Sequence, residues 1–371
     1  MKKYLKTIML LLIIIVIGLG AFFGKIFIKE PNKPVADIQA TDIQPADAQP
    51  TATETPEATR APLTPEQLQQ HVDELLLKAT VKPNENPVVG VGTGTDFDAV
   101  TRKAVENAGG LKEIIKKGDS VLIKPNMITM ARPAEGIITD YRVVQSLVDQ
   151  ALEAGAAKVY VGDGSPWGRV LQNSMCKYTE LTNCEIVDFN DFKKEDCYQL
   201  RPLNPILPKQ IYNIPKIYMD ADVVISAAKL KTHAEGVVTL TLKNAFGIPP
   251  MGSARIGVGK TYLHTNGIPN SIVELNLIRK PEFVVIDGII GGEGRGPIRS
   301  TPVDSQVVFA SLDPVACDMV GLTFMGFQLS EVPHVSLAEE HGLGIADLSK
   351  ISVNGANLDE IKMSFEHALG Y

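Results

Sequence analysis

Short apolar runs alternate with amphipathic segments along most of the chain, and this alternation limits the fold more than any other feature. The runs are rich in β-branched residues, as strands are, and the segments between them carry apolar residues at helical spacing. Such alternation predicts an α/β fold with a mainly parallel or mixed sheet and helices on both faces. The expected strands are 88–91, 121–123, 159–161, 186–189, 223–226, 283–286 and 307–310, and the expected helices are 97–116, 143–154, 269–279 and 314–325.

Residues 81–371 are expected to form this α/β domain. From Pro87 onward it spans about 285 residues, which is near the upper limit for one hydrophobic core, so two lobes that share a cleft are an alternative. Thr64 and Gln67 have the spacing of a capping box, which predicts a helix over 64–80 in front of the domain. The apolar face of this helix consists of Leu68, Val72, Leu75 and Leu76.

An uncharged and largely apolar run over residues 8–24 predicts one transmembrane helix within residues 1–29. Lysines precede the run at positions 2, 3 and 6 and follow it at 25 and 29. The positive cluster in front favours a cytoplasmic N-terminus and an extracytoplasmic body, as in a single-pass protein of the cell membrane. The alternative is a cleaved secretory signal, which would make the protein secreted, although no A-x-A pattern follows the run.

Residues 30–63 are dominated by Pro, Ala, Thr, Asp and Gln, with almost no large apolar side chain. Such a segment buries too little surface to offset the entropy lost on ordering, so we expect a disordered linker. It would tether the domain to the anchor with a reach of roughly 30 to 100 Å, depending on how extended it is.

The chain of 371 residues has a formal net charge of −7 and a pI near 5.5. Because a nucleic-acid groove needs a concentrated basic surface, this balance argues against nucleic acid as a partner. The four cysteines fit neither a zinc nor an iron–sulfur spacing. Inert thiols are expected, with one disulfide among Cys176, Cys184 and Cys197 as the alternative.

Polar side chains gather just after four of the expected strands. In open α/β sheets, ligands bind beyond the carboxyl ends of the strands, where such side chains meet. A cleft with several cations and oriented amides suits a carboxylate or a phosphate, so we expect a small anionic ligand. The residues are Lys124 and Asn126, Asp163 and Ser165, then Ser226, Lys229, Lys231 and His233, and lastly Asp287 with a glycine-rich run over 291–297 that is expected to be a flexible loop.

Seven short motifs occur between residues 88 and 327. They are K-P-N at 124–126, G-D-G-S at 162–165, K-x-K-T-H at 229–233, threonines at 239 and 241, K-N-x-x-G at 243–247, E-G-R-G-P at 293–297 and S-L-D-P-V-A-C-D at 311–318. In this order they resemble the DUF362 family, which is named for having no assigned function.

The resemblance implies functional positions without implying a reaction. Many relatives look like fusions to ferredoxin-type domains, which suggests a redox or iron–sulfur partner protein. This chain has no C-x-x-C-x-x-C run, so no intrinsic iron–sulfur cluster is expected. Carried over position by position, the functional residues are Lys124, Asn126, Asp163, Lys229, Lys231, His233, Lys243, Asn244, Asp287, Glu293 and Asp313.

Functions from different classes fit these residues. One is an enzyme that acts on a small anion, with desolvated lysines as acid, base or nucleophile and His233 transferring protons near neutral pH. Another is a non-catalytic module that binds a ligand or docks a redox partner, and a third is a scaffold whose motifs only maintain the fold. The expected catalytic residues are Lys229, Lys231, His233 and Asp287, and the expected ligand-binding residues are Lys124, Asn126, Asp163, Ser165, Lys243, Asn244, Glu293 and Asp313.

Further signals concern cofactors. One cofactor considered is a divalent metal, which would have mixed histidine and carboxylate ligands. The run G-V-G-K-T at 257–261 imitates the end of a P-loop, but Ala254 occupies the position of the first glycine. Glycines 90, 92 and 94 imitate a dinucleotide fingerprint that lacks its third glycine, so neither motif predicts nucleotide binding. The candidate metal ligands are His233, His264, Asp287 and Glu293.

Overall fold

The computed structural model describes residues 64–78, 84–251 and 260–368. These residues belong to one compact unit, so the α/β domain is a single body in place of the two lobes considered above. The anchor and linker that the sequence predicts over residues 1–63 lie outside the described residues. Among the helices that are described, none combines the length and the apolar character that a membrane span requires.

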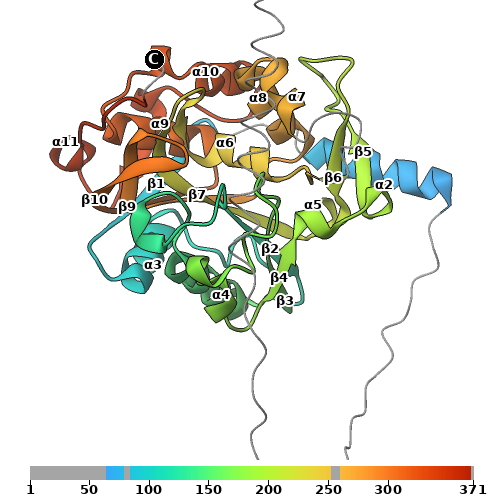
Figure 1. Cartoon of the computed structure of the whole chain (residues 1–371), viewed down its shortest axis with the longest axis horizontal. Helices are drawn as coiled ribbons and strands as arrows, with labels where there is room; N and C mark the ends of the chain where they lie inside the picture. Colours follow the sequence, from blue (N-terminus) through green and yellow to red (C-terminus); the bar gives the residue numbers. More distant parts are fainter. Residues whose placement is uncertain (1–63, 79–83, 252–259, 369–371) are drawn as a thin grey trace, which may run out of the picture. The chain divides into compact units, whose positions relative to one another are not determined.

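A mixed, mostly parallel sheet forms the centre of the domain (Figure 1). Within the described ranges its strands are β1 (Val88–Thr93), β2 (Ser120–Pro125), β3 (Lys158–Asp163), β4 (Glu185–Asp188), β7 (Val223–His233), β8 (Val237–Thr239), β9 (Phe283–Arg295), β10 (Arg299–Ser311) and β11 (Ser352–Asn354). Their order is β11, β1, β10, β9, β7, β2, β3, β4, with β8 paired to β7. The strands from β9 to β4 are parallel, whereas β10 is antiparallel to both neighbours. The predicted α/β class is confirmed.

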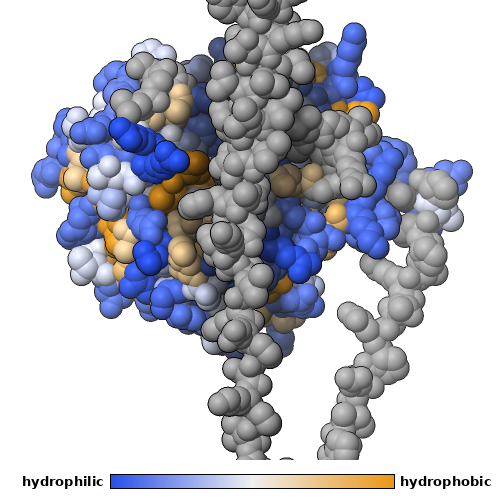
Figure 2. All heavy atoms as spheres, viewed as in Figure 1, coloured by the Kyte–Doolittle hydropathy of each residue, from blue (hydrophilic) through white to orange (hydrophobic). Residues whose placement is uncertain are grey.

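Helices cover both faces of the sheet (Figure 1). One face carries α3 (Phe97–Asn107) and α4 (Tyr141–Ala154), and the other carries α8 (Ile268–Ile278), α9 (Pro314–Phe324) and α10 (Pro333–Glu340). Side chains of β2 alternate between the faces, because Val121 and Ile123 join the core under α3 and α4 while Leu122 faces the other way. The described surface in Figure 2 is mostly hydrophilic, as expected when the helices turn their apolar sides to the sheet.

A third core cluster joins α2 (Pro65–Lys78) to β5 (Cys197–Leu200), β6 (Tyr212–Pro215) and α5 (Lys216–Asp220). The predicted capping box of α2 is confirmed, since the Thr64 amide donates to Gln67 Oε1 at 2.9 Å and the Gln67 amide donates to Thr64 Oγ1 at 3.3 Å. The remaining helices of the described chain are the short α6 (Thr241–Asn244), α7 (Thr261–Thr265) and α11 (Leu358–Ile361).

The predicted helix over 97–116 is too long, because α3 ends at Asn107. Gly109 and Gly110 follow with φ of 106° and 80°, backbone conformations that interrupt a right-handed helix. Leu111 and Ile115 are nevertheless buried, as the apolar spacing predicted, although they lie in the turns that follow the helix.

Strands β7 and β9 are longer than predicted, and both continue through polar motifs. All 11 residues of β7 are buried, including K-x-K-T-H at 229–233. The expectation of a flexible loop over 291–297 is wrong, since β9 runs to Arg295 and pairs with β10. The glycines serve close packing instead: a Cβ at Gly292 would lie 2.3 Å from the carbonyl oxygen of Gly136, and one at Gly296 would lie 2.0 Å from that of Thr232.

Candidate functional site

A pocket of about 260 Å³ lies at the carboxyl edge of β2, β3 and β7. The three strands are parallel neighbours, so their carboxyl ends bring Lys124, Asp163 and His233 to one place. Seven of the lining residues are among the predicted site residues, namely Lys124, Asn126, Asp163, Lys231, His233, Lys243 and His264. Lining residues that were not predicted to bind or react include Glu235, Thr239, Phe246 and Lys260.

A buried ion pair forms the base of this site. Lys124 Nζ lies 2.5 Å from Asp163 Oδ1, and both side chains are 3% exposed. Burial lowers the pKa of Lys124, while the Asp163 carboxylate opposes this shift. A Cβ at Gly247 would lie 2.0 Å from Asp163 Oδ1 and 2.4 Å from Lys124 Nζ, so the last position of K-N-x-x-G admits only glycine beside this pair.

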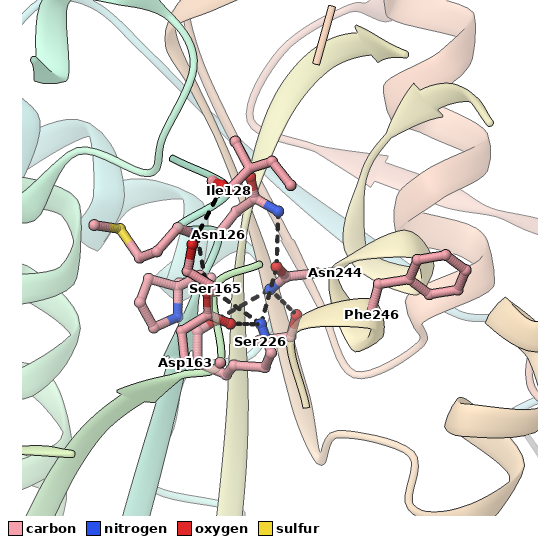
Figure 3. Close-up of polar contacts among 12 residues, drawn as sticks. Asn126, Ile128, Asp163, Ser165, Ser226, Asn244 and Phe246 are labelled. Atoms are coloured by element: carbon pink, nitrogen blue, oxygen red, sulfur yellow. Dashed lines mark hydrogen bonds and ion pairs between the residues drawn. The ribbon is translucent and has the colours of Figure 1, made fainter. Parts of the chain in front are cut away.

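Asn244 connects the strands to α6 (Figure 3). Its side-chain amide donates to the carbonyl oxygen of Lys124 and to Ser226 Oγ, each at 3.0 Å. Its Oδ1 accepts from Asn126 Nδ2 at 3.1 Å and from Lys124 Nζ at 3.3 Å. Because all four contacts are to protein groups and the residue is fully buried, Asn244 positions its neighbours and does not line the pocket.

The carboxylate of Asp318, on α9, holds the start of α6. It accepts from the Thr241 amide at 2.7 Å, from Thr241 Oγ1 at 2.6 Å and from the Leu242 amide at 3.0 Å. Two backbone amides at the start of a short helix are thereby satisfied. Burial raises the pKa of Asp318 to about 7. Lys243 and Asn244 are the last two residues of the same short helix, so this carboxylate helps to fix where both side chains lie.

Lys231 reaches the pocket wall without a carboxylate partner among the described residues. Its Nζ donates to Asn126 Oδ1 at 2.9 Å and to the carbonyl oxygen of Ile137 at 2.5 Å. The side chain is fully buried, and burial together with the charges of Lys229 and Lys243 lowers its pKa well below the usual value for lysine.

Two further lysines meet the pocket from α6 and from the start of α7. Lys243 Nζ lies 3.5 Å from the centroid of the Phe246 ring. Burial lowers the pKa of Lys243 to about 7, the charge of Glu235 opposes this shift, and the charges of Lys260 and Lys124 add to it. Lys260 Nζ donates to the carbonyl oxygens of Phe246, at 2.8 Å, and Gly164. Burial lowers the pKa of Lys260 to about 7 as well. At neutral pH both groups therefore exchange readily between amine and ammonium.

His233 is a neutral hydrogen-bond donor in this environment. Its Nδ1 accepts from the backbone amides of Glu235 and Gly236, at 3.0 and 3.1 Å, so the ring proton resides on Nε2. Burial, followed by the charges of Lys243 and Lys231, lowers its pKa to about 2. The proton transfer near neutral pH expected of His233 does not suit such a ring, whereas donation from Nε2 does.

Comparison with known proteins places the chain in a family. The family model described as a domain of unknown function, DUF362, matches residues 121–323. A thylakoid-associated protein from Synechocystis sp. is 31% identical over 256 residues, which cover 66% of this chain and 75% of that protein. The chain belongs to the DUF362 family. A crystal structure of a protein from Thermotoga maritima is 13% identical, with a TM-score of 0.36, and covers 67% of this chain and 60% of the solved chain.

The DUF362 motifs divide between the pocket and the core. Lys229 and Asp287, predicted to be catalytic, form a fully buried ion pair of 2.8 Å across the neighbouring strands β7 and β9. Asp287 Oδ2 also accepts from the Asp140 amide at 2.7 Å, at the start of α4. Neither residue lines the pocket. This DUF362 pair joins two strands and a helix inside the core.

Besides Asn244, three other predicted ligand-binding residues lie outside the lining of the pocket. Asp313 caps α9 by accepting from the Ala316 amide at 2.9 Å, and its other oxygen accepts from the Ile345 amide at 3.1 Å. Glu293 accepts from the Glu366 amide at 2.9 Å. Ser165 Oγ donates to the carbonyl oxygen of Ile128 at 3.2 Å. Each of these side chains fixes a loop or a helix end.

The predicted metal ligands are not brought together. His233 and His264 both line the pocket, and His264 Nδ1 lies 2.9 Å from Glu235 Oε2. Asp287 and Glu293 have the other partners given above. Over residues 64–78, 84–251 and 260–368, no three His, Cys, Asp or Glu side chains are grouped as metal ligands. None of the four cysteines forms a disulfide.

Lys260 is the pocket residue that the sequence analysis missed most clearly. It belongs to G-V-G-K-T at 257–261, which fails as a P-loop. Because the motif does not predict nucleotide binding, it gives no reason to expect Lys260 at a ligand site. Glu235 lies two residues after the end of K-x-K-T-H, and Phe246 occupies a variable position of K-N-x-x-G. A position inside or close to a family motif could therefore have pointed to Glu235 and Phe246. No local sequence pattern marks Lys260.

Proposed function

We propose that this DUF362 protein binds a small anion, a carboxylate or a phosphate, in the pocket and acts on it there as an enzyme. The observation that carries the proposal is the set of three pocket lysines, Lys231, Lys243 and Lys260, which lack a carboxylate within ion-pair distance in the described residues. A buried ammonium group without a counter-charge is unfavourable, and a bound anion would supply that charge.

Two neutral groups support the same proposal. Thr239 Oγ1 is buried at the pocket wall without a hydrogen-bond partner in the described part of the chain. Buried hydroxyl groups nearly always have a hydrogen-bond partner. An oxygen atom of a bound ligand would supply that partner for Thr239 Oγ1. Nε2–H of His233 is a second donor free to reach a ligand, since the backbone amides occupy only Nδ1. Cations and neutral donors together suit an oxyanion.

The test is calorimetric titration of the protein with inorganic phosphate and with lactate. We expect Lys260→Met to weaken binding by about tenfold or more, because a charge-assisted hydrogen bond is worth about 1.5–3 kcal/mol. Affinity should fall as pH rises above 7, because the ligand needs the ammonium forms of Lys243 and Lys260 and their pKa values are about 7.

Lys280→Met is the matched control. Lys280 is partly buried, its pKa is lowered mainly by burial, and its Nζ donates to the carbonyl oxygen of Leu343, but it does not line the pocket. Equal loss of affinity in both variants, or no anion binding at all, would contradict the proposal. Tight binding of many anions without turnover of any would favour the non-catalytic module.

We also propose that residues 1–29 anchor the domain at the cell membrane, outside the cytoplasm, through the linker over 30–63. The support is the uncharged apolar run with lysines on both sides. The name of the relative from Synechocystis sp., thylakoid-associated protein, agrees with a membrane location for a DUF362 protein.

A further inference from the structure

Lys243 differs from the other lysines of the pocket in having no polar partner. Lys124 is paired with Asp163, Lys231 donates to three oxygens, and Lys260 donates to two carbonyl oxygens. Lys243 Nζ forms no hydrogen bond or ion pair with any residue that the structure describes, and its contact is the face of the Phe246 ring at 3.5 Å. Its nitrogen is therefore available to a molecule in the pocket.

We propose that Lys243 is the nucleophile of this pocket and forms an imine with the carbonyl carbon of a small oxo acid. The inference rests on the anion binding proposed above. A neighbouring cation would hold the carboxylate of the oxo acid. Lys260 is the candidate, because it is the cation whose charge affects the pKa of Lys243 most. The ketone or aldehyde carbon would then lie beside the Lys243 amine.

The chemistry needs no oxidant, reductant or cofactor. The amine nitrogen adds to the carbonyl carbon, and one proton moves from nitrogen to the carbonyl oxygen, giving a carbinolamine. The hydroxyl group then leaves with a second proton as water, and the carbon–nitrogen double bond forms. The balance is one amine and one carbonyl compound giving one imine and one water.

The surroundings of Lys243 favour this reaction. Imine formation requires the amine, and burial beside other lysines gives a substantial amine fraction at neutral pH. The helix that carries Lys243 is held at both ends. Asp318 accepts from the amide at the start of α6, and Asn244, the last residue of α6, donates to Lys124 on β2 and to Ser226 on β7. Gly236 leaves room for the lysine stem, since a Cβ there would lie 3.3 Å from Lys243 Cε.

The experiment is reductive trapping. The full-length protein is incubated with pyruvate or glyoxylate, reduced with sodium borohydride and weighed by intact mass spectrometry. We expect one covalent adduct per chain, located at Lys243 by peptide mapping, and loss of more than nine-tenths of it in Lys243→Arg, which keeps the charge but not the nucleophile. At saturating concentrations of the oxo acid, the rate of trapping should rise with pH through about 7, as the Lys243 amine forms.

Controls separate this inference from the proposed anion site. Lactate, which has the same charge but no carbonyl group, should bind and give no adduct. Lys280→Arg should trap the oxo acid like the unaltered protein. If lactate binds but no adduct forms, or if the adduct is spread over surface lysines and survives Lys243→Arg, the imine is overturned and anion binding stands. If phosphate binds but neither lactate nor pyruvate does, the imine is overturned, and if none of the three binds, both proposals are overturned.

Discussion

Buried lysines are the feature that distinguishes this domain from an ordinary α/β core. Lys124 and Lys229 are each paired with an aspartate, whereas Lys231 and Lys243 are equally buried and have no carboxylate within ion-pair distance in the described residues. A paired lysine has its counter-charge within the protein, whereas an unpaired one is buried without a counter-charge. The unpaired lysines are thus the ones whose burial a ligand would explain.

Gly247 should be one of the least replaceable residues of the site. Its backbone has an ordinary negative φ, so alanine meets no conformational penalty there and the effect is one of space alone. Gly247→Ala would drive a methyl group into the Lys124–Asp163 pair, which is buried and cannot move away freely. We expect a loss of about 1–3 kcal/mol in the free energy of unfolding, measured by urea denaturation.

Gly321→Ala is the control for this effect. A Cβ at Gly321 would lie 3.1 Å from the tip of the Ile286 side chain, inside α9, where alanine is a better helix former than glycine. Its free energy of unfolding should change by less than that of Gly247→Ala. Equal changes in the two variants would mean that the close approach to the ion pair is not what requires the glycine.

At the scale of elements, α6 depends on a single carboxylate from α9. Asp318→Ala would leave the Thr241 and Leu242 amides buried without their partner. We expect a loss of about 2 kcal/mol or more in the free energy of unfolding, and weaker anion binding because α6 carries Lys243. Denaturant titration and calorimetry measure the two effects. Unaltered binding in a folded Asp318→Ala variant would show that α6 keeps its place without the carboxylate.

The same carboxylate should contribute to the pH dependence of stability. Its pKa is about 7 in the folded protein and about 3.8 for an unperturbed aspartate, so the folded state binds the proton more tightly. The stability that protonated Asp318 contributes to the folded state is therefore fully present below pH ~4 and is lost as pH rises toward 7. The stability difference between the protein and Asp318→Asn, which cannot titrate, should change over this range. A difference that is constant with pH would contradict the raised pKa.

The elements show how far the sequence alone could lead. Alternation of apolar runs predicted the α/β class, and α4, α8 and α9 begin and end within two residues of their predicted bounds. The ends of β7 and β9 were placed too early, since lysines and glycines resemble the end of a strand when their burial is unknown. Lys229 and Asp287 were for that reason predicted to lie beyond the strands, whereas they pair within the sheet.

The site was predicted in outline, because the carboxyl ends of parallel strands meet wherever the sheet forms. Lys124, Asn126 and Asp163 come together for this reason. Lys260 could not be predicted in the same way. It approaches the pocket from outside the sheet, from the start of α7, and no periodicity or spacing encodes that approach.

At the scale of the whole molecule, the position of the pocket relative to the cell depends on residues 1–63. An extracytoplasmic domain on a linker would meet small anions from outside the cell rather than from metabolism within it. The pocket chemistry proposed here needs only a substrate and water, so it does not depend on nucleotides that the cytoplasm supplies. The proposed membrane attachment and the proposed imine chemistry are thus compatible with each other, and neither depends on the other.

Attachment can be tested by comparing the full chain with a variant that lacks residues 1–29. The apolar run over residues 8–24 is close to the minimum length that spans the hydrocarbon core of a bilayer. If it is the proposed anchor, the full chain should remain in the membrane pellet after carbonate extraction. The shortened variant should appear in the soluble fraction and bind lactate with the same affinity, because the described residues that line the pocket lie between Lys124 and Pro297. The intact mass of the full chain decides between an anchor and a cleaved signal. A pelleted chain of full mass supports the anchor. A soluble chain that has lost its N-terminal segment indicates a secreted protein. A soluble chain of full mass would contradict both.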